Sequence, residues 1–200
     1  MTGLKLYTHP KSRGRIARWM LEETGRPYET EVMDYGAPLQ SAAFRALNPM
    51  GKVPVLVAEG QVVTETAAIC AFLAEACPEA GLAPLPSERA NYLRWMFFAA
   101  GPLEQAISAR MFGFEPSAEQ RRSVGFGDYD STVIALAGWL TDHDHVTGVR
   151  FTAADVYVGS QVMFALSFGG LPAHPAFLAY RERLAARPAF RRASELDGPM

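Results

Sequence analysis

Two short segments of this 200-residue chain carry the groups that chemistry would need. The first, residues 8–15, reads Thr-His-Pro-Lys-Ser-Arg-Gly-Arg and places Ser12 as a candidate N-cap before a predicted helix. The second, residues 48–69, contains an apolar run with Pro54 inside it, a Glu-Gly turn and the helix start Thr-Glu-Thr. Proline cannot donate to a strand ladder, so Pro54 does not fit a central strand. The second segment therefore gathers polar side chains and free backbone groups in one place.

The predicted helix 13–24 begins with an excess of cations. Arg13, Arg15 and Arg18 crowd its N-terminal end, where the helix macrodipole disfavours positive charge. Arg18 can pair with Glu22 one turn later, but Arg15 has no acidic residue at that spacing. Two interpretations remain open. Either an anion binds at this helix end, or the arginines are surface groups that pair across tertiary contacts.

The cysteines and histidines do not predict a metal or redox site. Cys70 and Cys77 are seven residues apart on one predicted helix, about 10 Å along its axis, which is too far for a disulfide. We expect both to be reduced and buried. His143, Asp144 and His145 have metal-binding side chains, but they lie in a predicted loop without a further ligand nearby, so no metal is expected.

Composition predicts a globular protein without affinity for polyanions. The chain is 49% hydrophobic and 20% charged, with a net charge of −2. That balance gives no reason to expect nucleic acid or an acidic membrane as a partner. No apolar run approaches the roughly 18 residues that span a bilayer, and the N-terminus lacks a signal-peptide pattern. We therefore expect a cytoplasmic protein.

The first 80 residues alternate strand and helix patterns. Strand patterns cover residues 4–7, 28–32, 51–57 and the run after a turn at 59–60; helix patterns cover 13–24, 42–47 and the segment from 64 onward; residues 34–38 read as a loop. This order predicts a mixed sheet, with a parallel crossover first and a hairpin last.

The remainder of the chain reads as helices. A Gly/Pro-rich break covers 80–86, and we expect an N-terminal domain at 1–79, a linker at 80–87 and an all-helical domain at 88–200. The first predicted helix covers 87–114, with a kink or break at Pro102. Two more begin at capping boxes: one runs from Ser117/Gln120 to about 140, and the other from Thr152/Asp155 to about 168. A further helix covers 175–186, and the last begins at Pro188.

Four motifs together resemble the glutathione S-transferase family over nearly the whole chain. They are P-x-S-R-x-x-x-x-x-W-x-L-E-E from Pro10, N-P-x-G-K-V-P-V-L from Asn48, E-T-x-A-I from Glu65 and F-T-x-A-D from Phe151. The resemblance is to bacterial, serine-type cytosolic members. It implies an α/β thioredoxin-like N-terminal domain, an all-α C-terminal helical bundle and, usually, a homodimer.

The resemblance also implies a glutathione site. The Val53–Pro54 bond would be cis, which would turn the Val53 backbone toward the cysteinyl backbone of glutathione. Glu65 and Thr66 would hold the γ-glutamyl end. Lys52 would reach the glycyl carboxylate. Arg15 is a weaker candidate for an anion contact nearby.

The same resemblance implies a catalytic hydroxyl. In serine-type members a hydroxyl near the start of the first helix donates to the glutathione sulfur, and Ser12 stands there. Tyr7 is the alternative, as in tyrosine-type members, although it lies one residue too early relative to Pro10. The absence of a cysteine near Ser12 argues against the cysteine-type members. Phe112 is the best candidate for the apolar pocket of the second substrate.

The function implied is that of a glutathione transferase, which activates the glutathione thiolate to attack a small hydrophobic electrophile in detoxification. Two alternatives remain open. One is a glutathione-dependent isomerase or dehalogenase that uses the same site. The other is a non-catalytic binding or regulatory protein with the same fold.

Overall fold

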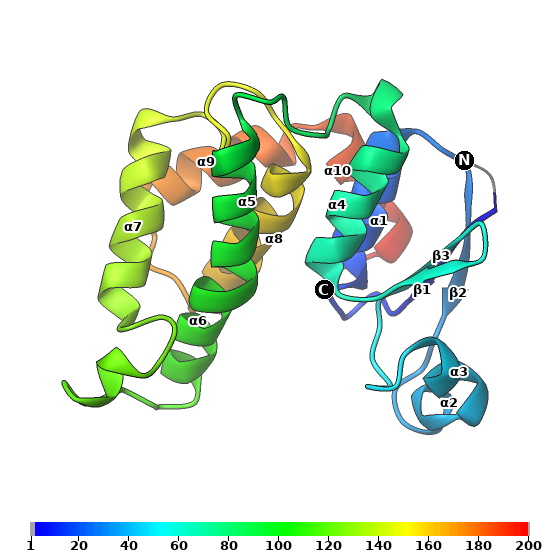
Figure 1. The fold of residues 1–200 in the computed structure, drawn as a ribbon, viewed down its shortest axis with the longest axis horizontal. Helices are drawn as coiled ribbons and strands as arrows, with labels where there is room; N and C mark the ends of the chain where they lie inside the picture. Colours follow the sequence, from blue (N-terminus) through cyan, green and yellow to red (C-terminus); the bar gives the residue numbers. More distant parts are fainter. Residues whose placement is uncertain (1–2, 200) are drawn as a thin grey trace. The chain divides into compact units, whose positions relative to one another are not determined.

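The computed structural model describes residues 3–199, and the chain divides into two compact units. The first unit contains the chain up to Ala83 together with the segment that begins at Ala186. The second unit is Pro84–Ala185. Figure 1 labels helices α1–α10 and strands β1–β3.

The first unit is built on a four-stranded sheet. Its strands are β1 (Leu4–Thr8), β2 (Tyr28–Val32), β3 (Val55–Ala58) and β4 (Gln61–Val63), and its helices are α1 (Gly14–Thr24), α2 (Ala37–Gln40), α3 (Ala42–Leu47), α4 (Thr66–Ala76) and α10 (Pro188–Asp197). The strand order is β2-β1-β3-β4; β1 and β2 are parallel, and β3 is antiparallel to both β1 and β4. The predicted mixed sheet is confirmed, and with its helices it forms the thioredoxin-like arrangement.

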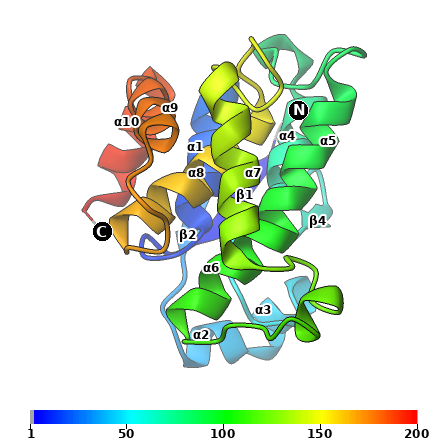
Figure 2. The same cartoon turned by 90° about the vertical axis from the view of Figure 1, so that its left-hand side faces the viewer.

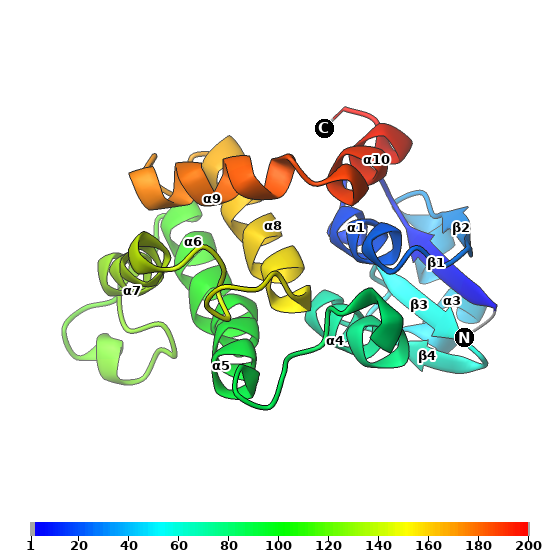
Figure 3. The ribbon, with the colours of Figure 1, turned by 90° about the horizontal axis from the view of Figure 1, so that it is seen from above.

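One face of the sheet is covered by α1 and α4. The side chain of Thr8 at the end of β1 lies against Gly14 at the start of α1. Side chains alternate along a strand, so Leu4 and Leu6 point to the same face, where both are buried. Figure 3 shows α1 between α4 and α10 on this face.

The other face carries a smaller core beneath α2 and α3. Met33, Leu39, Phe44 and Val55 are buried together, with Tyr7 packed against them. The short helix α2 was not predicted, because residues 34–38 contain the turn-forming pattern Asp-Tyr-Gly-Ala-Pro. Proline at the second position of α2 is compatible with a helix start, since the first amides of a helix need no intrahelical partner.

The second unit is helical throughout. It contains α5 (Arg89–Phe98), α6 (Glu104–Met111), α7 (Tyr129–Asp142), α8 (Ala153–Ser167) and α9 (Pro175–Ala185). A π-helical segment, Ala99–Leu103, joins α5 to α6 and contains Pro102, so the predicted interruption at this proline is confirmed. Helix α8 is buried along most of its length and packs against α5 and α9 (Figure 2).

The predicted helix from 117 to 140 is wrong in its first half. The Ser117/Gln120 capping box forms, since Gln120 Oε1 accepts the Ser117 N–H at 2.8 Å. However, it opens only a single 3₁₀ turn, and α7 begins at Tyr129. The chain between them contains Gly127 with φ +67°, a conformation that ends helical geometry and favours glycine.

The capping box at the start of α8 forms as predicted. Asp155 Oδ2 accepts the Thr152 N–H at 2.9 Å, and the other carboxylate oxygen accepts the Tyr180 hydroxyl at 2.8 Å. Both Asp155 and Thr152 are fully buried. The carboxylate therefore joins the start of α8 to α9 as well as capping its own helix.

Helix α10 packs on the first unit, whereas the sequence predicts one helical domain over residues 88–200. The rings of Trp19 on α1 and Phe190 on α10 meet edge to face, with centroids 5.0 Å apart. Arg18 Nε and Asp197 Oδ1 are 2.8 Å apart. The apolar and charged partners of α10 thus lie on α1, far away in sequence, where local patterns cannot reveal them.

Within residues 3–199, no helix has both the length and the apolar character needed to cross a membrane.

Candidate functional site

Three loops of the first unit converge at one edge of the sheet. Tyr7 of β1 pairs with Val55 of β3, and Leu56 of β3 pairs with Val63 of β4. Because both pairings are antiparallel, the end of β1, the start of β3 and the end of β4 lie at the same edge. The fold therefore brings together the loop of Ser12, the residues before β3 and the start of α4.

The residues before β3 present unpaired backbone. The Val53–Pro54 bond is cis, and the strand begins only at Val55. Within residues 3–199, neither the N–H nor the C=O of Val53 has a hydrogen-bond partner. The Asn48 amide holds the loop by donating to the Lys52 carbonyl at 2.8 Å. A backbone donor and a backbone acceptor are thus both available to a ligand that approaches as an extended chain.

The start of α4 suits a ligand group that carries a carboxylate and an ammonium. Glu65 has φ +63° and ψ 116°, a conformation rare outside glycine that concentrates at functional sites. No side chain caps the first amides of α4, so this positive helix end can receive a carboxylate. The Glu65 carboxylate is exposed and pairs with no side chain in the described chain, so it can receive an ammonium. Thr66 is 8% exposed and adds a hydroxyl.

Ser12 lies partly buried between β1 and α1, and its hydroxyl is engaged locally. It donates to the His9 carbonyl at 2.7 Å and accepts the Gly14 N–H at 2.9 Å. Arg13 directly precedes α1 but has helical dihedral angles and makes no side-chain cap, whereas the Ser12 hydroxyl makes the capping bond expected of it. A hydroxyl carries one proton, so Ser12 must turn from His9 before it can donate to a ligand.

Tyr7, the alternative to Ser12, faces the small core beneath α2 and α3. Its ring centroid lies 6.0 Å from that of Phe44 and 4.8 Å from the ammonium of Lys5. Tyr7 and Thr8 point to opposite faces of β1, and Thr8 is the one beside the start of α1. The geometry therefore favours Ser12 over Tyr7.

Three further predicted residues have different surroundings. The Lys52 side chain is exposed and pairs with no described side chain. The Arg15 guanidinium donates to the carbonyls of Pro10 at 3.1 Å and Gly198 at 2.9 Å, so it is already occupied. Phe112 follows α6 in the second unit with 87% of its surface exposed, and its role in a substrate pocket stays a prediction.

Both cysteines are free and buried, as predicted. Burial raises the pKa of the Cys70 thiol, and burial is also the main cause of a raised pKa at Cys77. A thiol with a raised pKa is a poor nucleophile at neutral pH. Neither cysteine is therefore suited to covalent chemistry.

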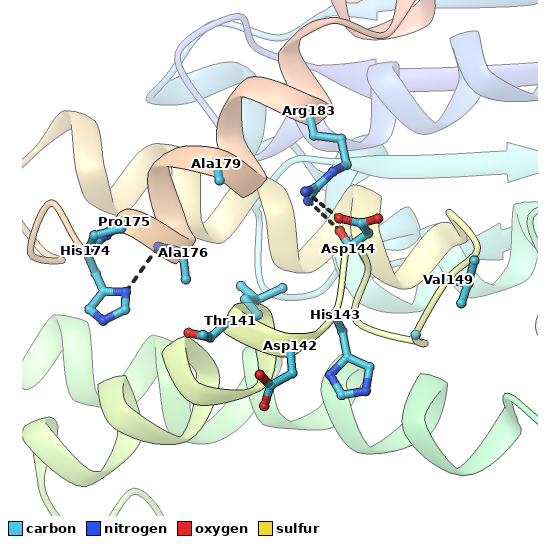
Figure 4. A pocket seen from close by; sticks show the side chains of 12 residues that line it. Thr141, Asp142, His143, Asp144, Val149, His174, Pro175, Ala176, Ala179 and Arg183 are labelled. Atoms are coloured by element: carbon cyan, nitrogen blue, oxygen red, sulfur yellow. Dashed lines mark hydrogen bonds and ion pairs between the residues drawn. The ribbon is translucent and has the colours of Figure 1, made fainter.

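The second unit has a separate cavity of about 740 Å³ beside α7 and α9. Figure 4 shows Arg183 turned toward Asp144, with 2.6 Å between Nη2 and Oδ1, while His143 points elsewhere. The His143 ring stacks on Trp139, with centroids 3.8 Å apart. Within residues 3–199, no group of three or more His, Cys, Asp or Glu side chains is arranged to hold a metal ion.

Sequence reasoning missed two residues beside the Ser12 loop. The Tyr35 hydroxyl donates to the Lys11 carbonyl at 2.8 Å, and its ring lies 4.3 Å from that of His9. Thr8 is fully buried, and its hydroxyl has no hydrogen-bond partner within the described chain. No local pattern marks Tyr35, because its partner lies 24 residues away.

Comparison with known proteins shows which family this chain resembles. The family model described as "Glutathione S-transferase, N-terminal domain" matches residues 13–76. The maleylacetoacetate isomerase of Pseudomonas aeruginosa is 30% identical over 210 residues, which cover 98% of each chain. The glutathione S-transferase GstA of Escherichia coli O157:H7 is 27% identical, over 98% of this chain and 99% of that protein.

Solved structures agree with the sequence relatives. A glutathione transferase from Methylococcus capsulatus superimposes with a TM-score of 0.78 at 29% identity, over 98% of both chains. A sphingomonad glutathione S-transferase in complex with glutathione gives a TM-score of 0.77 at 28% identity, over 98% of this chain and all of that one. With the matching N-terminal model and a 30% identical relative of nearly equal extent, this chain belongs to the glutathione S-transferase family.

Proposed function

We propose that this protein is a glutathione transferase whose site lies at the edge of the sheet where Ser12, Val53 and Glu65 meet. The start of α4 carries the proposal. Its uncapped amides, beside an exposed acid in a rare backbone conformation, suit the α-carboxylate and ammonium of a γ-glutamyl group. The sphingomonad relative, whose structure holds glutathione, supports the choice of this ligand.

Each end of glutathione has a matching partner in this proposal. Glu65 and Thr66 receive the γ-glutamyl end. The unpaired N–H and C=O of Val53 pair with the cysteinyl backbone, and the exposed ammonium of Lys52 reaches the glycyl carboxylate. Arg15 is not included, because its guanidinium already binds two carbonyls.

Ser12 then stabilises the reactive form of the thiol. Its hydroxyl turns from the His9 carbonyl and donates to the glutathione sulfur, which favours the thiolate over the thiol. The thiolate attacks an electrophilic carbon of a small apolar substrate, so a C–S bond forms and the leaving group departs with its electron pair. The proton of the thiol passes to solvent.

A glutathione-dependent isomerase is the second candidate. The relative with 30% identity over 98% of both chains is named a maleylacetoacetate isomerase. An isomerase uses the same thiolate but expels it again, so glutathione is not consumed. A transferase consumes one thiol for each product formed, and this difference in thiol balance separates the two functions.

The test measures binding first and thiol balance second. Calorimetric titration with glutathione should show one site, and assays should then follow free thiol while the protein turns over an activated halonitrobenzene or a cis-configured unsaturated diketo acid. Loss of thiol with the halide supports the transferase. Product without thiol loss supports the isomerase. Absence of binding at millimolar glutathione contradicts both and favours a non-catalytic protein.

We infer further that the protein acts in detoxification as a cytoplasmic homodimer. The family resemblance supports this inference. Sedimentation equilibrium should give twice the mass of the 21.8 kDa chain, and a monomer at micromolar concentration would contradict it.

A further inference from the structure

The loop that carries Ser12 is held through its carbonyl groups. The His9 carbonyl accepts the Ser12 hydroxyl, and the Lys11 carbonyl accepts the Tyr35 hydroxyl. Between them, the Pro10 carbonyl accepts Nη1 of Arg15 at 3.1 Å. Three successive carbonyls are therefore fixed by three different side chains.

Arg15 connects this loop to the end of the chain. Nη1 donates to the Gly198 carbonyl at 2.9 Å as well as to the Pro10 carbonyl. The two acceptors are 188 positions apart in sequence, counted from residue 10 to residue 198. A guanidinium can serve both because its donors are held in one rigid plane. Hydrogen bonds from a cation are also stronger than those between neutral groups.

The end of the chain is itself firmly anchored. Asp197, next to Gly198, pairs with Arg18, and their side chains are only 1% and 8% exposed. At the other end of α10, Arg187 donates to both carboxylate oxygens of Glu23 at 2.6 and 2.7 Å. The segment after α10 is thus a fixed support against which Arg15 can hold the loop.

These contacts also decide between the two interpretations of the α1 arginines. Arg18 pairs with Asp197 and not, as predicted, with Glu22; Glu22 pairs with Arg192 at 2.8 Å. Arg15 binds carbonyls. Buried Arg18 and partly buried Arg15 therefore both take tertiary partners from the C-terminal end of the chain, so neither needs an anion.

We propose that Arg15 is a positioning residue, which holds the Ser12 loop against the C-terminal end of the chain and so aims the serine hydroxyl at the thiol. This inference rests on the proposed role of Ser12. It also replaces the predicted contact of Arg15 with glutathione, since the guanidinium would act through the loop and not on the ligand.

The first experiment needs no glutathione. Amide hydrogen exchange is measured over residues 9–16 in the wild type, Arg15→Lys and Arg192→Gln. Lys carries its ammonium on a flexible stem with freely rotating donors, so it should hold the two carbonyls less rigidly than Nη1 does, and exchange should become several-fold faster in Arg15→Lys. Arg192→Gln is the matched control, because it removes another α1–α10 ion pair that does not touch the loop. Unchanged exchange in Arg15→Lys would overturn the proposal.

The second experiment measures the consequence for the thiol. In Arg15→Lys the thiol pKa of bound glutathione should rise by about one unit, which lowers the ratio of thiolate to thiol about tenfold. The value of kcat should fall, and the affinity for glutathione should stay nearly unchanged. Added guanidinium ion should restore both the loop protection and the thiol pKa in Arg15→Ala. A normal thiol pKa with weakened binding would mean that Arg15 contacts glutathione, and the proposal would be wrong.

The two proposals fail in different ways. Should the wild type show no glutathione thiolate, the proposed function fails, while the exchange of the loop still decides the role of Arg15. Should Ser12→Ala raise the thiol pKa and Arg15→Lys leave it unchanged, the role of Ser12 stands and the positioning role of Arg15 does not.

Discussion

At the scale of single residues, Glu65 combines local backbone strain with a proposed role in glutathione binding. Its backbone adopts φ +63°, which costs roughly 1–3 kcal/mol for a residue with a side chain. Glycine would adopt this conformation without that cost. The proposed glutathione site would account for an acid here, because the carboxylate stands beside the open amides of α4.

We predict that Glu65→Gln weakens glutathione binding by about 10- to 100-fold, because a charge-assisted contact is worth roughly 1.5–3 kcal/mol. Thr66→Ala should weaken it less, since a neutral hydroxyl contributes roughly 1 kcal/mol. Calorimetric titration measures both. Glu59→Gln, the same change at the far turn of the β3–β4 hairpin, is the control and should bind like the wild type. Equal affinities for all four proteins would remove Glu65 from the site.

We also predict that Glu65→Gly preserves or raises stability while reducing affinity. Relief of the strained backbone offsets the roughly 0.5–1 kcal/mol of chain entropy that glycine loses on folding. Urea unfolding of the ligand-free protein measures this balance. A loss of more than about 1 kcal/mol would show that Glu65 stabilises the fold rather than a ligand.

The sequence alone points to those residues of the proposed site that belong to short motifs. Ser12, Val53, Pro54 and Glu65 stand within such motifs, and the fold brings their segments to one edge of the sheet. Arg15 shows where local patterns stop being informative. Its side chain could be noticed as an unpaired cation, but its acceptor at Gly198 belongs to a segment that only the folded chain brings near.

At the scale of elements, the start of α1 is set by a close approach to β1. A Cβ atom on Gly14 would lie 1.8 Å from the Thr8 hydroxyl and 2.9 Å from that of Ser12. Glycine is therefore required for packing and not for its dihedral angles. This contact fixes where α1 begins, and the position of Ser12 follows from it.

We predict that Gly14→Ala destabilises the protein by about 1–3 kcal/mol, the usual range for overpacking. It should also impair the Ser12 loop, visible as lower turnover. Gly138→Ala is the matched control, because Gly138 is an exposed position of α7 with open space around it. Alanine there should stabilise by up to about 1 kcal/mol. Chemical denaturation measures both changes, and a stabilised Gly14→Ala would contradict the contact.

The helix predictions succeeded where capping and periodicity agreed. The Thr152/Asp155 box opens a long helix because an apolar segment follows it. The Ser117/Gln120 box has the same local chemistry, yet its helix stops after one turn. Glycines at 125 and 127 follow it, and a longer helix begins only at the Asp128 cap, which accepts the Ser131 N–H at 2.8 Å. A cap starts a helix only when the following residues can propagate it.

At the scale of the whole molecule, each of the two units has its own long-range ion pairs. In the helical unit, Arg150 pairs with Glu88 through two contacts, Nη2–Oε2 at 2.5 Å and Nε–Oε1 at 3.1 Å. The bond from Arg150 is the main cause of a lowered Glu88 pKa. A lowered folded-state pKa stabilises the protein above the unfolded-state pKa, and that stabilisation is lost as the pH falls through the folded value.

We predict that this pair makes the free energy of unfolding decrease as the pH falls below about 4.3, the pKa of free Glu. Glu88→Gln should lower stability at pH 7 by about 0.2–1 kcal/mol, since it removes an anion that Arg150 contacts while a third of the Arg150 side chain is open to water. It should also reduce the slope of stability against pH in the acid range. Thermal unfolding at several pH values tests this, and an unchanged slope would contradict it.

In the proposed function, Ser12 stabilises the thiolate of glutathione bound at the sheet edge. The most direct test of this role is the ultraviolet absorbance of the thiolate, titrated against pH in the wild type, Ser12→Ala and Tyr7→Phe. We predict a wild-type thiol pKa below the free value of about 8.5. Ser12→Ala should raise that pKa by about 1–2 units, the equivalent of one lost hydrogen bond to an anion, and Tyr7→Phe should leave it unchanged. A raised pKa in Tyr7→Phe with none in Ser12→Ala would contradict the role of Ser12.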